Sequence, residues 1–198
     1  MSLDLISIRR ELHQVPELAF HEFETKAILL KYLKTLPDIN IIEFLNSPGI
    51  LVEYSQGNGL YRLFRADMDA LPVKETTGCD FMSRNEGIMH SCGHDVHMTI
   101  LLGLIEEITK IKPATNLLFL FQPAEEGQGG AESILAEGII QQYPVESVYA
   151  LHIASGMPVG TVSSRPGIFF GVPQEFNVEF YGITAHAVTP EKGIDALR

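Results

Sequence analysis

Residues 116–121 constrain the fold of this chain more than any other segment. They read Asn-Leu-Leu-Phe-Leu-Phe, so a strand formed here carries apolar side chains on both of its faces. Such a strand needs cover on both sides, which is typical of a central parallel strand in an α/β sheet. We therefore expect a mixed, largely parallel sheet that is flanked by helices.

The segments before and after this strand supply the remaining elements. Apolar residues spaced three and four apart indicate helices, and short apolar runs between turn residues indicate strands. The expected helices span residues 3–15, 22–36, 95–110 and 129–140, and the expected strands span 39–44, 49–54, 60–66, 145–151, 160–162, 168–170 and 175–181. In the third helix, one apolar face is formed by Val96, Ile100, Leu101, Leu104 and Ile108. The turn sequence at 56–59 predicts that the strands beside it pair as a hairpin.

The charge and composition of the chain disfavour several functional classes. With 25 Asp and Glu residues against 14 Lys and Arg residues, the formal net charge is −11. This charge disfavours binding to nucleic acid or to an anionic membrane. Two cysteines in 198 residues indicate no disulfide framework, the first residues do not resemble a secretory signal, and the longest uncharged run is too short to cross a bilayer. We expect a cytoplasmic protein.

The segment 90–97 concentrates groups that bind metal ions. It reads His-Ser-Cys-Gly-His-Asp-Val-His, and a turn at Gly93 can direct the Cys92 thiolate and the His94 imidazole to one point. These two ligands suit a transition metal such as zinc, manganese or cobalt. Asp95 is the expected N-cap of the helix that follows. A lone cysteine is more often a small buried apolar residue, so further ligands have to come from elsewhere in the chain.

Three strand-like runs end in groups that coordinate metals or transfer protons. These groups are Asp67 and Asp69, Glu125 and Glu126, and His152. Because the carboxyl ends of parallel strands share one edge of a sheet, we expect these side chains to meet the Cys-Gly-His turn. Of two adjacent glutamates, one can bind a metal while the other accepts a proton from water. The alternative is that these side chains are solvated ends of strands and loops.

The motifs at 65–72, 89–99 and 121–127, together with 9–13 and 16–18, resemble the M20 family of metallopeptidases and amidohydrolases. The similarity covers nearly the whole chain and is highest to the aminoacylase/hippurate-hydrolase branch. Within that branch, 117–135 and 150–162 are most similar to enzymes that deacetylate N-acetyl-diaminopimelate. The resemblance implies a zinc-peptidase-like catalytic domain and a small-molecule N-acyl amino acid as substrate.

The resemblance also assigns roles to individual residues. It implies two divalent transition metal ions (Zn, Mn, Co or Ni), with Glu125 as the general base that later acts as an acid. The implied metal ligands are Cys92, His94, Glu126 and His152.

Two aspartates and one further histidine complete the implied site. Asp69 stands at the place of an aspartate that orients a metal ligand, whereas Asp67 replaces a metal-binding histidine of other branches and is an active-site residue of open role. His186 matches a lid-domain histidine that polarises the substrate carbonyl, often across a homodimer. The alternative for His186 is an exposed loop histidine.

The end of the chain departs from the family pattern. Members carry a lid domain inserted into the catalytic domain, and a last histidine ligand follows it. We expect residues 1–172 to belong to the catalytic domain and 173–198 to begin an α+β lid, so that the chain is truncated at its carboxyl end and inactive by itself. Glu191 also stands where many members have a second histidine.

Several functions remain open from the sequence. The first is hydrolysis of N-acetyl-L,L-diaminopimelate to diaminopimelate and acetate, which belongs to lysine biosynthesis. The second is an aminoacylase or hippurate-type hydrolase for other N-acyl amino acids, and the third is a non-catalytic metal-binding module. A Cys92 nucleophile is disfavoured, because no thiol-protease signature surrounds it.

Overall fold

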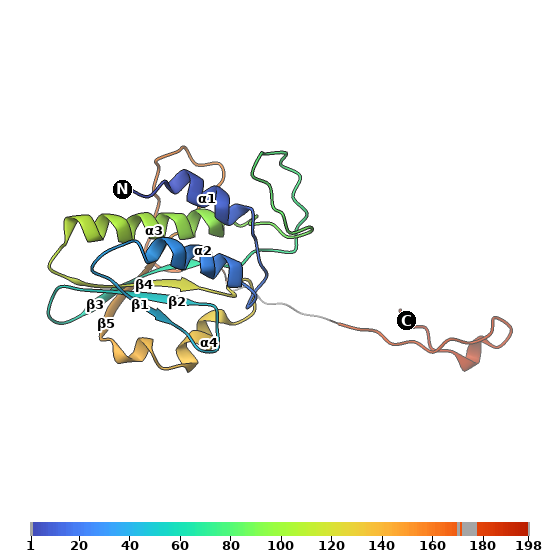
Figure 1. Cartoon of the computed structure of the whole chain (residues 1–198). Helices are drawn as coiled ribbons and strands as arrows, with labels where there is room; N and C mark the ends of the chain where they lie inside the picture. Colours follow the sequence, from blue (N-terminus) through green and yellow to red (C-terminus); the bar gives the residue numbers. More distant parts are fainter. Residues whose placement is uncertain (1, 170, 172–177, 198) are drawn as a thin grey trace. The chain divides into compact units, whose positions relative to one another are not determined.

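The computed structural model describes residues 2–169, 171 and 178–197, which fall into two compact units, Met1–Val162 and Ser163–Arg198. The predicted domain boundary at 172/173 and parts of the strands predicted at 168–170 and 175–181 lie outside the described residues. The first unit holds the sheet and the main helices, shown in sequence colours in Figure 1.

The sheet of the first unit has five strands in the order β1-β2-β4-β3-β5. The strands are β1 (Asn40–Glu43), β2 (Ile50–Ser55), β3 (Tyr61–Asp67), β4 (Asn116–Gln122) and β5 (Val145–Ala150). β4 is central and buried along its whole length, as its two apolar faces predict. It pairs antiparallel with β2 and parallel with β3, and β3 pairs parallel with β5, so the expected mixed sheet is confirmed.

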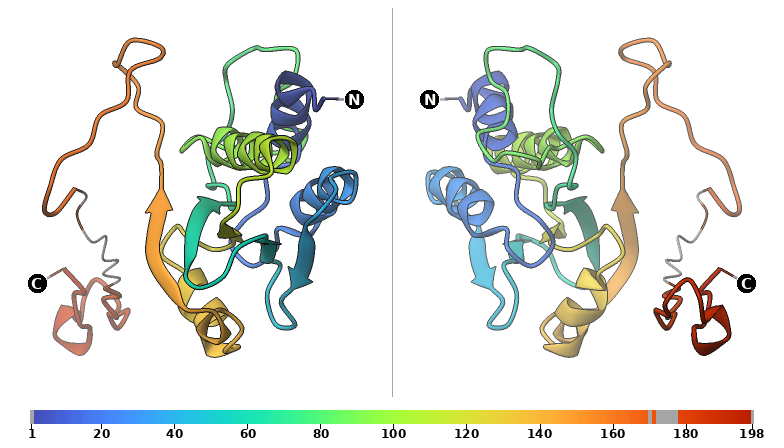
Figure 2. Two further views of the ribbon diagram at one scale, coloured as in Figure 1. Left: turned by 90° about the vertical axis from the view of Figure 1, so that its left-hand side faces the viewer. Right: turned by 90° about the vertical axis from the view of Figure 1, so that its right-hand side faces the viewer.

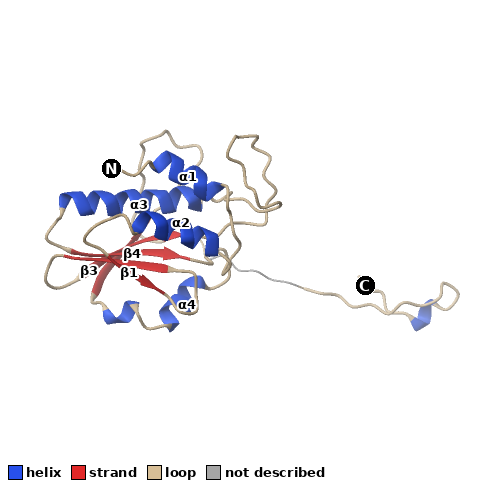
Figure 3. Ribbon diagram, in the orientation of Figure 1, coloured by secondary structure: helices blue, strands red, loops and turns tan. Residues whose placement is uncertain are grey.

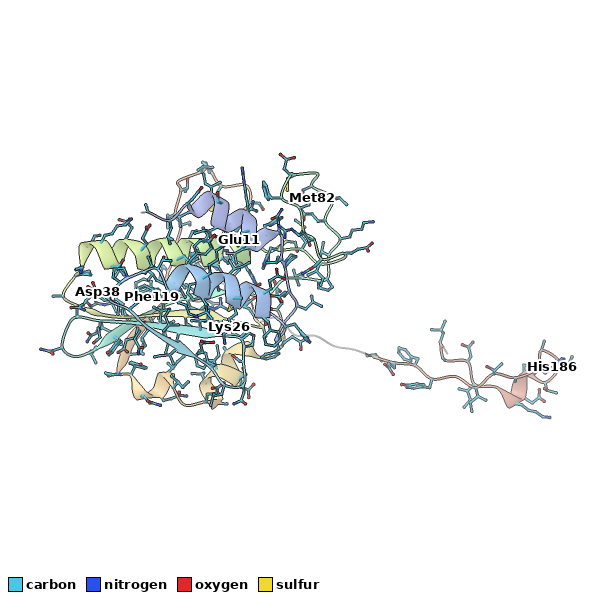
Figure 4. All side chains as sticks on the ribbon, in the orientation of Figure 1. Glu11, Lys26, Asp38, Met82, Phe119 and His186 are labelled. Carbon is cyan, nitrogen blue, oxygen red and sulfur yellow. The ribbon has the colours of Figure 1, made fainter. Side chains whose placement is uncertain are left out.

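Helices cover both faces of this sheet, as Figures 2 and 3 show. One face carries α1 (Leu5–His13), α2 (Phe23–Leu33) and α3 (His94–Ile111), and the other carries α4 (Gly130–Ala136) and the 3-10 turn η1 (Ile140–Gln142). Phe119, labelled in Figure 4, points from β4 into the larger core beneath the three helices. Leu118 and Leu120 point into the smaller core with Ile134 of α4.

The predicted hairpin between β2 and β3 is wrong, because β4 lies between these two strands. Burying both faces of β4 requires a neighbour on each side, and this outweighs the local turn preference of 56–59. Instead β2 pairs antiparallel with β1 on one side and with β4 on the other. The 56–59 loop is bound by the start of β4, where the Asn116 side chain accepts the Gly57 N–H (2.9 Å) and donates to the Gly59 carbonyl (3.3 Å).

One prediction about α3 is wrong and a second is confirmed only in part. Its N-cap is Gly93, in the left-handed region at φ 86°, and the Asp95 carboxylate instead contacts α1. Of the predicted apolar face, Leu101 is buried and Leu104 and Ile108 pack against the core, whereas Ile100 is 41% exposed. The buried surface is centred on Met98, Leu102 and Ile105. The helix is covered by α1 on one side and by the sheet on the other, so the buried surface is broader than a single stripe of residues.

Residues after β5 form little regular structure among those described. No strand is present at 160–162 or 168–169, and the second unit has one isolated bridge, Ile183 with Ile194, and the turn η2 (Pro190–Lys192). No helix among the described residues combines the length and apolarity needed to span a membrane.

Candidate metal and catalytic site

The candidate site lies where β3, β4 and β5 end and α3 begins. β3 ends at Asp67, two residues before Asp69, and β4 leads into the loop with Glu125 and Glu126. His152 follows β5 by two residues, and His94 is the first residue of α3. The parallel pairing of these three strands places their carboxyl ends at one edge, as predicted.

The predicted ligand atoms converge at this edge. Cys92 Sγ lies 3.3 Å from His152 Nε2, and the ligand atoms of Cys92, His94 and His152 lie within 4.8 Å of one another. His94 Nε2 lies 3.7 Å from a Glu126 oxygen and 3.9 Å from a Glu125 oxygen. Atoms that share a tetrahedral zinc ion are roughly 3–4 Å apart, so these spacings suit a common cation.

The hydrogen bonds of two histidines leave the same ring nitrogen for a metal. The Nδ1 atom of His94 donates to the backbone carbonyl of Asp69 (2.9 Å), and that of His152 donates to the carbonyl of Ile153 (2.7 Å). Because a carbonyl only accepts, Nδ1 carries the hydrogen in both rings, so Nε2 is the ring nitrogen whose lone pair faces the candidate site. Partners of this kind orient metal-binding histidines in many proteins.

Asp69 links two parts of the site. Its carboxylate accepts the N–H of Glu126 (2.9 Å), and its other oxygen lies 3.4 Å from His94 Nδ1. Burial raises the pKa of Asp69, but the bonds from His94 and Glu126 outweigh it, so the pKa is lowered. The carboxylate therefore stays ionised and holds one candidate ligand on α3 and another on the β4 loop.

Two buried ligand atoms, 3.7 Å apart, make no hydrogen bond to any of the described residues. These are His94 Nε2 and one Glu126 oxygen, Oε1. Leaving such atoms unpaired in a protein interior is costly, and a cation between them would satisfy both. The residues present therefore fit a divalent metal ion.

The charges around Cys92 also favour a cation. Burial and the nearby Glu126 carboxylate raise the pKa of the Cys92 thiol to about 12. The His94 pKa is also raised, because Asp69 and Asp67 outweigh the effect of burial. Carboxylates thus make the site strongly negative, and a bound metal would stabilise the thiolate that ligation requires.

Glu125 differs from Glu126 in its surroundings. Its side chain is 39% exposed against 25% for Glu126, and its carboxylate faces His94. Burial and the Asp67 charge raise the Glu125 pKa. A carboxyl group with a raised pKa that borders both the ligand atoms and solvent can take up and release a proton.

Sequence reasoning missed a role for His97, although it lies within the metal-binding motif. Its side chain is fully buried and donates from Nδ1 to Asp67 (2.7 Å), which also pairs with Arg65 (2.8 Å). Burial raises the pKa of Asp67, but His97 and the neighbouring positive groups outweigh it and lower the pKa to about 2. Asp67 is thus an ionised hydrogen-bond partner of His97.

A second cluster, of His13, Glu75 and Cys79, also has metal-ligand composition. His13 lies between two carboxylates, with Nδ1 2.8 Å from Asp95 and Nε2 3.2 Å from Glu75. Both ring nitrogens are thus engaged, and Glu75 accepts further hydrogen bonds from Thr77 and Ser83. These hydrogen bonds and ion pairs of the cluster link α1, α3 and the 70–90 loop.

His186 belongs to the second unit, where its side chain is exposed and its Nδ1 accepts the N–H of Val188 (3.2 Å). The contact described for His186 lies within its own unit, so its predicted substrate role stays a prediction.

Comparisons with known proteins complete the description of the site. Residues 63–198 match the family described as peptidase family M20/M25/M40. The chain is 40% identical over 193 residues to N-acetyldiaminopimelate deacetylase of Exiguobacterium sibiricum, and 45% identical over 192 residues to that of Oceanobacillus iheyensis. These matches cover 97% and 96% of this chain, which spans about half (52%) of the length of each relative.

A solved structure agrees with these matches. A Bacillus subtilis protein described as a dinuclear metal-binding peptidase of the M20 family is 34% identical to this chain. The two superpose with a TM-score of 0.77, and the match covers 82% of this chain and 46% of the other.

Proposed function

The chain belongs to peptidase family M20/M25/M40, and we propose from this that it forms the metal-binding half of an N-acyl-amino-acid amidohydrolase. Its reaction would be the removal of an N-acetyl group from an amino acid, with N-acetyl-L,L-diaminopimelate as the first candidate. The observation that carries the proposal is the pair of buried ligand atoms of His94 and Glu126 that lie 3.7 Å apart without a hydrogen bond, beside Cys92 and His152.

Cys92, His94, Glu126 and His152 would hold the metal, and we propose two divalent ions per complete site. Bound divalent ions supply the Lewis acidity that polarises an amide carbonyl and lowers the pKa of water. The Cys92 thiolate and two neutral imidazoles suit zinc, cobalt, nickel or manganese. Asp69 would fix the positions of His94 and the Glu126 backbone relative to each other, because its carboxylate contacts both.

Glu125 would carry the proton in this reaction. As a base it accepts a proton from the attacking water, and as an acid it delivers that proton to the amine that leaves. The products are acetate and the free amino acid. The raised pKa of Glu125 and its partial exposure support this role, because the carboxylate can reach both water and the leaving group.

The substrate is inferred from the deacetylases that this chain resembles along almost its whole length. Since the chain spans about half of each relative, turnover should be measured on the full-length protein that contains it. We expect two ions per full-length protein and at least one per 198-residue chain. Zinc and cobalt titration of the chain, followed by dialysis and elemental analysis, measures this.

Turnover of a substrate panel distinguishes the candidate functions. We expect acetate release from N-acetyl-L,L-diaminopimelate to exceed release from hippurate and simple N-acetyl amino acids. Higher turnover of benzoylated or other acylated amino acids would favour an aminoacylase or hippurate-type hydrolase. Metal binding by the full-length protein without turnover of any substrate would favour a non-catalytic metal-binding module.

His186 and residues 178–197 would contribute to substrate binding and to a homodimer, in keeping with the resemblance of 182–187 to the lid of the family. Light scattering of the full-length protein measures its mass, and His186→Ala is expected to raise KM or lower kcat without loss of metal. A monomeric protein or an unaffected variant would contradict this part of the proposal.

A further inference from the structure

His97 uses both of its ring nitrogens within the protein. Its Nδ1 lies 2.7 Å from Asp67 Oδ1, and its Nε2 accepts the backbone N–H of Ile153 at 3.0 Å. The side chain has no solvent exposure. A backbone N–H only donates, so Nε2 must be the acceptor and Nδ1 must carry the hydrogen that binds Asp67.

This bonding separates His97 from the two candidate ligands near it. In His94 and His152, Nδ1 binds a carbonyl and Nε2 faces the thiol or the carboxylates. In His97, Nε2 is occupied by Ile153. His97 therefore has no free lone pair for a metal, although its sequence position three residues after His94 would allow ligation.

The backbone N–H that His97 binds belongs to Ile153, the residue next to the candidate ligand His152. Ile153 directly follows His152, and the rings of His97 and His152 are 4.7 Å apart in an edge-on contact. The Ile153 side chain also packs on the start of α3, where a Cβ at Gly93 would lie only 2.2 Å from Ile153 Cδ1. Ile153 thus holds the loop after β5 on α3 in two ways, by its backbone N–H and by its side chain.

We propose that His97, oriented by Asp67, is a positioning residue that holds the Ile153 backbone and thereby directs His152 toward Cys92. This inference rests on the proposed metal site, because it matters only where His152 binds a cation. It gives Asp67 a role through His97, in place of the histidine ligand that other branches carry there.

The bond can be tested without any metal. Hydrogen exchange of the Ile153 amide, measured by NMR on the 198-residue chain, should be slow in the parent and at least tenfold faster in His97→Ala. His97→Gln offers a side-chain oxygen at the place of Nε2 and should restore most of the protection. His97→Asn places its amide near the position of Nδ1, where it can donate to Asp67 but does not reach the Ile153 N–H, so it should not restore the protection. An unprotected Ile153 amide in the parent, or equal protection in His97→Ala, would overturn the inference.

Cobalt binding then tests the consequence for the site. Loss of a partner that orients a ligand typically weakens metal affinity 10–100-fold, so we expect this range for His97→Ala and a smaller loss for His97→Gln. The thiolate-to-cobalt absorption of Cys92 should also shift as His152 is misplaced. Unchanged affinity and an unchanged spectrum in His97→Ala would contradict the positioning role.

Leu102→Ala is the matched control, because Leu102 is a fully buried residue of the same helix that lies in the apolar core. It should lower thermal stability and leave the Ile153 exchange and the cobalt spectrum unchanged at a temperature where the chain is folded. If Leu102→Ala lost as much Ile153 amide protection and cobalt affinity as His97→Ala, His97 would act only through the stability of the fold. Failure of the parent to bind cobalt would instead overturn the proposed function, while the Ile153 exchange still decides the role of His97.

Discussion

The Nδ1 atom of His94 donates to the backbone carbonyl of Asp69 at 2.9 Å, although the two residues are 25 positions apart in the chain. This bond assigns the hydrogen of the ring and turns Nε2 toward Glu125 and Glu126. The Asp69 side chain binds the Glu126 backbone at the same time. Asp69, in the loop after β3, therefore positions two candidate ligands that come from different elements.

Asp69→Asn is expected to weaken zinc binding 10–100-fold, the range typical for residues that orient a ligand. The asparagine keeps the size of the side chain but removes the charge that faces His94 and the Glu126 N–H. Competition with a chromophoric chelator measures the zinc Kd. Asp80→Asn is the control, because Asp80 is exposed and should leave the Kd unchanged. Equal affinities for parent and Asp69→Asn would contradict the prediction.

Glu125→Gln and Glu126→Gln should separate catalysis from metal binding. Without its proton-accepting carboxylate, the full-length Glu125→Gln protein should lose 10²–10⁴-fold in kcat, roughly the contribution of a general base, and retain its metal. The Glu126→Gln variant should instead bind metal more weakly, and its turnover should fall because the metal is lost. Acetate release and elemental analysis of the same samples measure both effects. A Glu125→Gln variant with undiminished turnover would remove Glu125 from the role of base.

The Cys92 thiol should be unreactive in the metal-free chain. Burial and the Glu126 carboxylate raise its pKa to about 12, so the thiol is protonated at pH 7.5 and the thiolate is scarce. In a Cys79→Ser background, alkylation by iodoacetamide should be at least tenfold slower than for a free cysteine, measured by mass spectrometry. Denaturing the chain should restore the ordinary rate. Rapid alkylation of the folded, metal-free chain would favour the nucleophile reading of Cys92.

The contribution of Glu22 to the stability of the fold should fall as the pH rises from 4.5 to about 7. This fully buried carboxyl accepts the N–H of Ala124 (2.8 Å) before the Glu125–Glu126 pair, and burial raises its pKa from 4.5 to about 7. Between these two values the unfolded chain loses its proton while the folded chain keeps it, so stability is full below pH 4.5 and decreases until about pH 7.

Glu22→Gln should remove that component of the pH dependence, because an amide has no proton to lose in this range. Urea unfolding at pH 5 and pH 8 measures the difference, which we expect to be on the order of 2 kcal/mol smaller in the variant. Glu24→Gln, at an exposed position two residues later, is the control. The same pH dependence in parent and Glu22→Gln would contradict the prediction.

Much of the fold and of the candidate site could be predicted from local sequence patterns. A strand with apolar residues on both faces has to be central, and β4 is central and fully buried. Polar groups directly after parallel strands have to meet at one edge, and Asp69, Glu126 and His152 do. These predictions depend on burial and on the expectation that a strand with two apolar faces has parallel neighbours, and both can be inferred from the apolar pattern of a short segment.

Tertiary structure alone decided which side chains pair across the molecule. β4 separates β2 from β3, and Asp95 binds His13 instead of capping α3, because a buried strand or carboxylate takes the partner that packing provides. The partners of His97 lie 30 and 56 positions away in sequence. Thus the sequence by itself determined which groups of metal-binding type gather at the sheet edge. Only the folded chain decided which histidine nitrogen is left for a metal, since that depends on hydrogen bonds between distant segments.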